Sequence, residues 1–143
     1  MAGADTNELP GFIAVETGDE GGGGGSFPAP YCGPLDFTSN VEPITLVDLA
    51  GINNVTSAVL NGTPDHEDFT AISGDVEQGM SYPIAMEGNT DGNFTNRFVV
   101  FIDWNQNEIL NDAGEVYEMT DLLINSTGTD GQQVNGDIAV PAD

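Results

Sequence analysis

The residues best suited to chemistry lie in one polar segment, between positions 103 and 115. Acidic and amide side chains stand there at alternate positions, as Asp103, Asn105 and Asn107. This spacing brings several oxygen ligands onto one hard cation, and Ca2+ takes roughly six to eight such oxygens. The backbone carbonyl of Ile109 follows at the next alternate position. The segment therefore predicts a structural Ca2+ site, because no open position for catalysis is evident in this set of ligands.

The segment departs from the spacing of an EF-hand loop. Glu108 stands where the turning glycine would be, and the acid that closes the metal shell is displaced. Asp112 lies two positions before the expected place and Glu115 one position after it. We expect one of these two acids to close the shell, without the flanking helices of an EF-hand. The alternative is an Asx-rich turn that closes a hairpin, in which Asp and Asn side chains bond to their own backbone.

A second polar cluster, Asp65-His66-Glu67-Asp68, holds three carboxylates and the only histidine. It is either a source of further oxygen ligands or a solvated loop, and the loop is the favoured interpretation. Catalysis by His66 as a general base requires an oriented nucleophile and a third group, and the sequence singles out neither. We therefore predict that the protein is not an enzyme. Trp104 and Tyr117 form either part of the core or a sugar-stacking platform, and the core is the commoner place for aromatics beside a central strand.

The elements that must position these residues are short strands. From Tyr31 onward, apolar runs are separated by clusters of Gly, Asn, Asp and Pro, and no helical period is sustained. The predicted strands are 44–49, 80–87, 98–102, 116–123 and 134–140. Residues 98–102 are apolar on both faces, as expected of a central strand, whereas Pro83 indicates an edge strand or a bulge. We predict an all-β, antiparallel β-sandwich of the jelly-roll or immunoglobulin-like type, with about six strands.

Residues 1–30 differ from the rest of the chain. The run Gly21–Gly25 and the Pro-rich stretch after it predict a flexible N-terminal arm and linker, followed by the sandwich domain at 31–143. The arm carries one apolar island, which consists of Phe12, Ile13, Ala14 and Val15. Such an island forms a single strand only when it joins a partner sheet, so we predict that it fills a sheet edge.

The composition limits the partners of this chain. It has 143 residues, which suits one domain, and 24 acidic residues against a single Lys or Arg give a formal net charge of −23. Nucleic acid is excluded as a partner, because phosphate contacts need basic side chains. No apolar stretch approaches the roughly 18 residues of a spanning helix, so direct membrane insertion is not expected. The first residues show no basic and apolar secretory signal, and the single cysteine, Cys32, excludes an intramolecular disulfide.

Several motifs resemble those of a known family. They are Tyr31-Cys32, Ala50-Gly51-Ile52-Asn53-Asn54, Glu67-Asp68-Phe69-Thr70, Gly79-Met80-Ser81-Tyr82, Phe101-Ile102-Asp103-Trp104-Asn105-Gln106-Asn107 and Asn111-Asp112-Ala113-Gly114-Glu115. Through these motifs, residues 31–141 resemble the first part of a GEVED domain. This family is a β-sandwich module of large secreted and cell-surface proteins of Bacteroidetes, often exported by the type IX system. The resemblance implies an extracellular or cell-surface location.

Two departures from the family pattern shape the functional hypotheses. Glu108 replaces the usual glycine, and the Gly-Glu-Val-Glu-Asp signature that follows in the family is absent from this sequence. A sandwich without those last strands exposes an unpaired edge, which another strand has to fill. The island at 12–15 fills it either in its own chain or in a neighbouring copy. The first hypothesis is therefore an extracellular structural or adhesion module, stiffened by Ca2+, whose partners are other protein subunits or a cell-surface scaffold.

Two alternatives belong to other functional classes. One is a surface protein of a virion or filament, such as a phage decoration protein or head fibre, anchored by residues 1–30. The N-terminal arm and the strongly negative charge favour it. The other is a carbohydrate-binding module with glycans as partners, which requires an exposed aromatic row. It ranks third, because the sequence has only three Tyr and one Trp.

Overall fold

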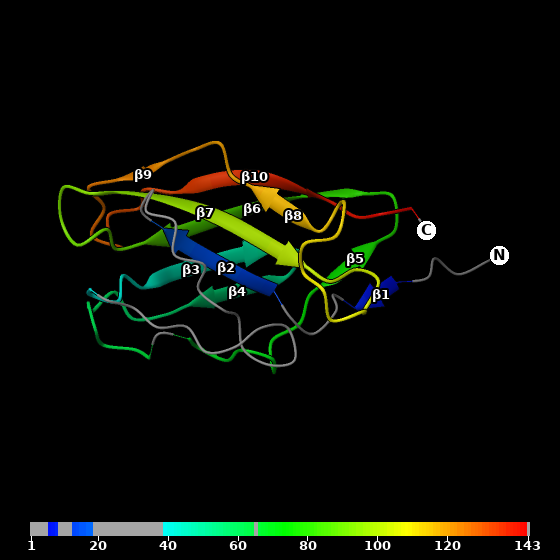
Figure 1. The fold of residues 1–143 in the computed structure, drawn as a ribbon, viewed down its shortest axis with the longest axis horizontal. Helices are drawn as coiled ribbons and strands as arrows, with labels where there is room; N and C mark the ends of the chain where they lie inside the picture. The colour runs from blue at the N-terminus through cyan, green and yellow to red at the C-terminus, as the bar shows by residue number, and fades with distance from the viewer. Residues whose placement is uncertain (1–5, 9–12, 19–38, 65, 143) are drawn as a thin grey trace.

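The computed structural model describes residues 6–8, 13–18, 39–64 and 66–142. These residues contain no helix and form an all-β sandwich of antiparallel sheets, which confirms the predicted fold class (Figure 1). The strands are β1 (Thr6–Glu8), β2 (Ile13–Gly18), β3 (Ile44–Leu49), β4 (Ile52–Val55), β5 (Asp75–Glu77), β6 (Ser81–Gly88), β7 (Thr95–Ile102), β8 (Val116–Glu118), β9 (Leu123–Ile124) and β10 (Val134–Ala139). Within this described part, no helix has the length and hydropathy needed to span a membrane.

One sheet has the strand order β10-β6-β3-β4 and the other has the order β2-β7-β8, with β9 also paired to β7. Strands β1 and β5 form a separate antiparallel pair. Consecutive strands β3 and β4 are joined by a tight turn at Ala50 and Gly51, whose φ angles are 49° and 92°. Positive φ at both central residues is the geometry that matches the right-handed twist of a hairpin.

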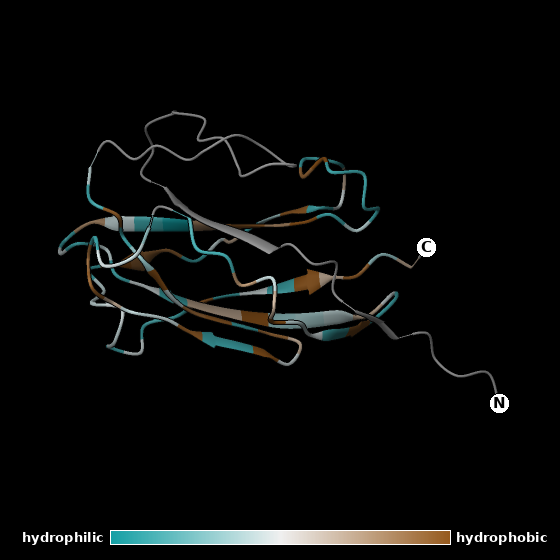
Figure 2. Ribbon diagram, turned by 90° about the horizontal axis from the view of Figure 1, so that it is seen from below, coloured by the Kyte–Doolittle hydropathy of each residue, from teal (hydrophilic) through white to brown (hydrophobic). Residues whose placement is uncertain are grey.

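The core lies between the two sheets. Phe98, Val100 and Ile102 alternate along β7 and are completely buried. They pack in one hydrophobic cluster with residues of the opposite sheet, including Ile84 and Ile138. Figure 2 shows hydrophobic strand segments in both layers. Strand β7 is therefore the central strand that the apolar run at 98–102 predicts.

Ten strands are present in the described residues, more than the six or so expected. Strand β4 was not predicted because two Asn residues separate its apolar ends. Strand β5 was not predicted because it has only one buried residue, Val76. The predicted strand at 116–123 is divided into β8 and β9, which both pair with β7.

Pro83 lies in β6, which has neighbours on both sides, so its prediction as a marker of an edge strand is wrong for the strand as a whole. The pairing explains how proline is tolerated there. Strand β3 pairs with β6 from Ile84 onward, and Pro83 lies beyond the end of β3. On its other side Pro83 is opposite Asp137 of β10. Locally, the proline faces an open side, where the missing N–H breaks no ladder bond.

Part of the predicted N-terminal arm joins the sheets of its own chain. Strand β2 runs antiparallel to β7, with Ile13, Ala14 and Val15 opposite Ile102, Phe101 and Val100. Strand β1 pairs with β5. Phe12, the linker at 19–30 and the Tyr31-Cys32 motif lie outside the described residues. The described part of the island, Ile13 to Val15, thus pairs with β7 within its own chain. Its predicted role as an assembly arm stays a prediction.

Candidate metal-binding loop

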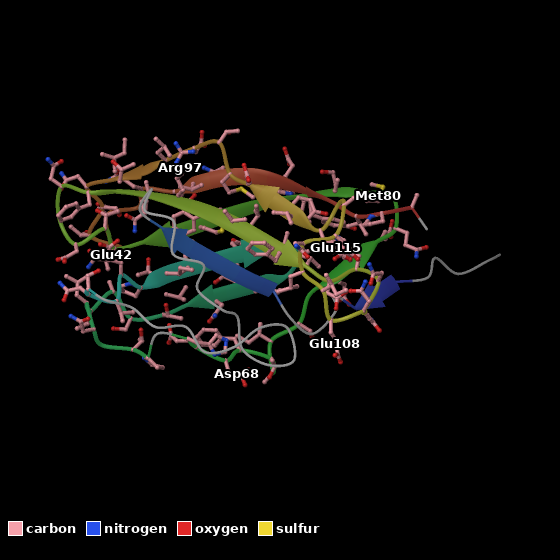
Figure 3. The ribbon with its side chains drawn as sticks, viewed as in Figure 1. Glu42, Asp68, Met80, Arg97, Glu108 and Glu115 are labelled. Atoms are coloured by element: carbon pink, nitrogen blue, oxygen red, sulfur yellow. The ribbon has the colours of Figure 1, made fainter. Side chains whose placement is uncertain are left out.

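The loop between β7 and β8 carries all the predicted metal ligands. It begins directly after Ile102 and ends at Glu115, and the backbone N–H of Ile102 donates to the carbonyl of Glu115 at 3.0 Å. This bond closes the base of the loop, so its two ends are held by the central strand and its neighbour β8. Figure 3 shows Glu108 and Glu115 at this end of β7.

Asp103 organises the first half of the loop. Its side chain is 1% exposed, and its Oδ1 and Oδ2 accept hydrogen bonds from the backbone N–H groups of Asn107 (3.1 Å) and Glu108 (2.9 Å). Asn105 Oδ1 also accepts from Asn107 N at 3.0 Å, and Asn107 Oδ1 accepts from Ile109 N at 2.8 Å. The alternate spacing seen in the sequence therefore winds the chain around the oxygens of these side chains.

Asp112 joins this group from the second half of the loop. Its Oδ2 accepts hydrogen bonds from the Nδ2 groups of Asn105 (3.3 Å) and Asn107 (2.8 Å). Glu115 is connected as well, because its Oε1 accepts from the backbone N–H of Asn105 at 3.3 Å. The structure thus brings together five predicted ligand residues. Ile109 takes part as a donor to Asn107, and the role of its carbonyl stays a prediction.

Glu115 differs from the other acidic side chains of this loop in how its carboxylate oxygens are hydrogen-bonded. Its side chain is only 2% exposed, and Oε2 is buried with no hydrogen-bond partner within the described part of the chain. A buried carboxylate oxygen left without a partner destabilises a fold by about 1–3 kcal/mol or more, because the water it lost is not replaced. A cation beside Oε2 would remove that penalty.

The missing glycine does not prevent the turn. Glu108 has a φ of 68°, in the left-handed region that glycine favours, and Gln106 has a φ of 57°. For a residue with a Cβ atom this conformation costs about 1–2 kcal/mol. The two hydrogen bonds that Asp103 accepts at Asn107 and Glu108 hold the chain in it.

Across the residues that the structure describes, no three His, Cys, Asp or Glu side chains converge as a metal-binding group. The three carboxylates of this loop, Asp103, Asp112 and Glu115, are therefore not gathered around one point in this structure. The predicted set adds the amide oxygens of Asn105 and Asn107 and a backbone carbonyl to them. The prediction of Ca2+ therefore stays a prediction.

The other polar cluster is exposed. His66 and Asp68 both lie on the surface, while Asp65 is outside the described residues. Asp68 Oδ1 accepts a hydrogen bond from the backbone N–H of Thr70 at 2.9 Å. This bond, more than any other contact, lowers the pKa of the Asp68 carboxyl group.

Trp104 and Tyr117 pack against the core, as expected from their position beside β7. The indole Nε1 of Trp104 donates to the hydroxyl oxygen of Tyr117 at 2.9 Å, and that hydroxyl donates to the carbonyl of Ala139 at 2.7 Å. Burial raises the pKa of Tyr117 above its usual value. The pair ties β8 to β10 across the two sheets and does not form an exposed aromatic row.

A second Asp-centred turn lies at residues 126–132 and was not predicted from the sequence. The two carboxylate oxygens of Asp130 accept four hydrogen bonds, from Ser126 Oγ (2.9 Å), Thr127 N (3.0 Å), and the backbone N (3.2 Å) and Nε2 (2.9 Å) of Gln132. These bonds, the one from Thr127 N first, lower the pKa of Asp130. The signal in the sequence was an Asp four residues after a Ser in a Gly-rich turn, which is too common to single out.

Comparisons with protein families, with curated proteins and with solved structures found no match to this chain. The resemblance to GEVED domains therefore stays a prediction.

Proposed function

We propose that this protein is a non-catalytic, extracellular structural or adhesion module whose loop at 103–115 binds one structural Ca2+. The observation that carries the proposal is the buried Oε2 of Glu115, which has no partner in the described part of the chain. Its other oxygen already accepts a hydrogen bond from Asn105, so the carboxylate is fixed against the loop. A cation that binds here satisfies an atom that the described side chains leave unsatisfied.

The chemistry of the ligands favours Ca2+ over other metals. The set consists of oxygen donors alone: Asp103, Asn105, Asn107, Asp112, Glu115 and the carbonyl of Ile109. Hard cations prefer such donors, whereas Zn2+ and Cu2+ prefer nitrogen or sulfur. Ca2+ accepts irregular shells of about six to eight oxygens, and Mg2+ demands a nearly octahedral one. The net charge of −23 further attracts divalent cations.

The amide groups explain how the loop keeps its shape before a metal binds. The Nδ2 groups of Asn105 and Asn107 donate to Asp112, which holds this acid close to the other ligands. Binding then needs a small change of side-chain orientation and little ordering of the backbone. A loop prepared in this way loses less conformational entropy when it binds its ion.

Thermal and chemical unfolding in calcium and in EDTA tests the proposal. We expect calcium to raise the free energy of unfolding by about 2.7 kcal/mol at a free concentration of about 100 times the Kd. The Glu115→Gln variant removes the buried charge. It should be as stable as the parent protein in EDTA, or more stable, and should lose the response to calcium.

The matched control is Glu108→Gln, which makes the same chemical change on an exposed side chain of the same loop. This variant should keep the response to calcium, and Mg2+ should stabilise the protein less than Ca2+ does. Equal stability of the parent protein in calcium and EDTA would contradict the proposal. The loop would then be an Asx-rich turn that binds no metal.

We infer in addition that the N-terminal arm joins copies of the protein. In this structure β2 pairs with β7 of its own chain over six residues, and the Gly21–Gly25 run that follows it in the sequence is the segment that would have to reach across for an exchange between copies. The same antiparallel pairing between two chains would link them by strand addition. Sedimentation of the full chain, and of a chain without residues 1–20, tests this part. Higher-order species that vanish on truncation support it, and a full chain that stays monomeric contradicts it.

A further inference from the structure

A surface pocket of about 510 Å3 lies near the start of β7, away from the loop at 103–115. Two segments line it, one before β3 and one that leads into and begins β7. The lining residues are Ser39, Asn40, Glu42, Asp91, Asn93, Phe94, Thr95 and Asn96. Figure 3 shows Glu42 at this end of the sandwich, away from Glu108 and Glu115. Two carboxylates, several amides and one aromatic ring meet in this pocket.

The carboxylates of the pocket are held in place by amides. Asn96 Nδ2 donates to Glu42 Oε2 at 2.5 Å, and Asn96 is only 5% exposed. Asn40 Nδ2 donates to Asp91 Oδ2 at 2.7 Å, and Asn40 itself accepts from Asn61 Nδ2 at 3.0 Å. Each of these amide bonds engages one oxygen of its carboxylate. Among the described residues, no hydrogen bond engages the second oxygen of Glu42 or of Asp91, so each offers an acceptor for a ligand at a fixed position.

The aromatic ring is presented to solvent by a fixed backbone. The side chain of Phe94 is 60% exposed. Its backbone N–H donates to Gly92 O at 2.9 Å, and its carbonyl accepts from Asn125 N at 3.0 Å. Before it, Asp91 and Gly92 turn the chain with φ angles of 51° and 100°. The ring therefore stands beside the polar groups without being part of the core.

We propose that this pocket binds a neutral carbohydrate. Carboxylate oxygens accept hydrogen bonds from sugar hydroxyls, whereas amide groups both accept and donate them. An exposed ring packs against the apolar C–H face of a pyranose. Acidic sugars are disfavoured by Glu42, Asp91 and the net charge of −23. A cationic amine needs only acceptors and makes no use of the amide donors in the pocket. The inference does not rest on the calcium loop, which lies away from this pocket.

Titrations followed by amide NMR spectra test the inference, in calcium and again in EDTA. The neutral probes are soluble hexasaccharides of β1,4-linked glucose, β1,3-linked glucose and mannose. The acidic probe is an alginate hexasaccharide, and the cationic probe is spermidine. We expect at least one neutral probe to shift the amides of residues 39–42 and 91–96 with a Kd of about 1 mM or tighter in both buffers.

Two phenylalanines supply a matched pair of variants. Phe94→Ala removes the ring in the pocket and should weaken binding by about tenfold or more. Phe69→Ala removes another exposed ring, 40% exposed and outside the pocket lining, and should leave the affinity unchanged. Asp91→Asn and Glu42→Gln should each weaken binding several-fold.

Three results would overturn the inference. They are the absence of shifts in the pocket with every neutral probe, an unchanged affinity in a folded Phe94→Ala variant, and binding of alginate or spermidine in place of the neutral sugars. The binding expected in EDTA separates this inference from the calcium proposal, because the failure of one leaves the outcome of the other unaffected.

Discussion

Two turns of this molecule are built around an aspartate, and they differ in how completely they satisfy their own polar atoms. In the turn at 126–132, Asp130 accepts four hydrogen bonds within seven residues. In the loop at 103–115, Asp103 is satisfied in a similar way, yet the buried Oε2 of Glu115 has no partner within the described residues. An acidic turn is thus not by itself a metal site. The unsatisfied buried oxygen of Glu115 is what distinguishes the loop for which we propose a cation from the turn at 126–132.

The largest effect is expected for Asp103→Ala. The change removes the acceptor for two backbone N–H groups, which costs about 2 kcal/mol of unfolding free energy in EDTA. In saturating calcium the loss should reach about 4–5 kcal/mol, because the variant also forfeits the stabilisation by the ion. Urea unfolding in the two buffers measures both values. An equal loss in calcium and in EDTA would show that Asp103 has no part in binding Ca2+. The loop would then resemble the turn at 126–132, for which no metal is proposed.

A smaller effect, independent of calcium, is expected for Gly128→Ala in the other turn. Gly128 has a φ of 74°, and a Cβ atom there would lie 2.8 Å from Thr45 Cγ2. Strain and overpacking together should lower the unfolding free energy by about 2–4 kcal/mol. Gly131→Ala is the matched control, since Gly131 has a φ of 75° and open space around it. It should lose only about 1 kcal/mol. Equal losses in the two variants would show that backbone strain alone matters here.

The smallest effect concerns the charge of Asp130, which is exposed and therefore screened by water. Its pKa in the folded protein lies below the ordinary value of 3.8. The ionised carboxylate therefore stabilises the fold above that pH, and the contribution is lost as the pH falls toward the folded pKa. Asp130→Asn should lower the melting temperature at neutral pH and differ less from the parent protein in acid. Exposed Asp121→Asn serves as the control, and a difference that does not change with pH would refute the explanation.

Local pattern was enough to predict part of this structure. Alternation of apolar residues predicted the all-β fold and the central position of residues 98–102, because burial on a strand follows a period of two. The spacing of Asp103, Asn105 and Asn107 predicted which residues gather in one loop, since contacts between residues two to five positions apart depend on the local backbone alone. The core position of Trp104 and Tyr117 followed from their place beside the central strand.

The tertiary structure alone decided the contacts between distant segments. Asn96 contacts Glu42 across 54 positions in the sequence, and the paired residues of β2 and β7 are 79 to 89 positions apart. No periodicity in the sequence encodes such pairs, because they depend on the order of strands in the two sheets. The burial of Glu115 was likewise decided by the tertiary structure. Its position in the sequence indicated a possible ligand, but the packing of the loop buries its side chain and leaves Oε2 without a hydrogen-bond partner among the described residues.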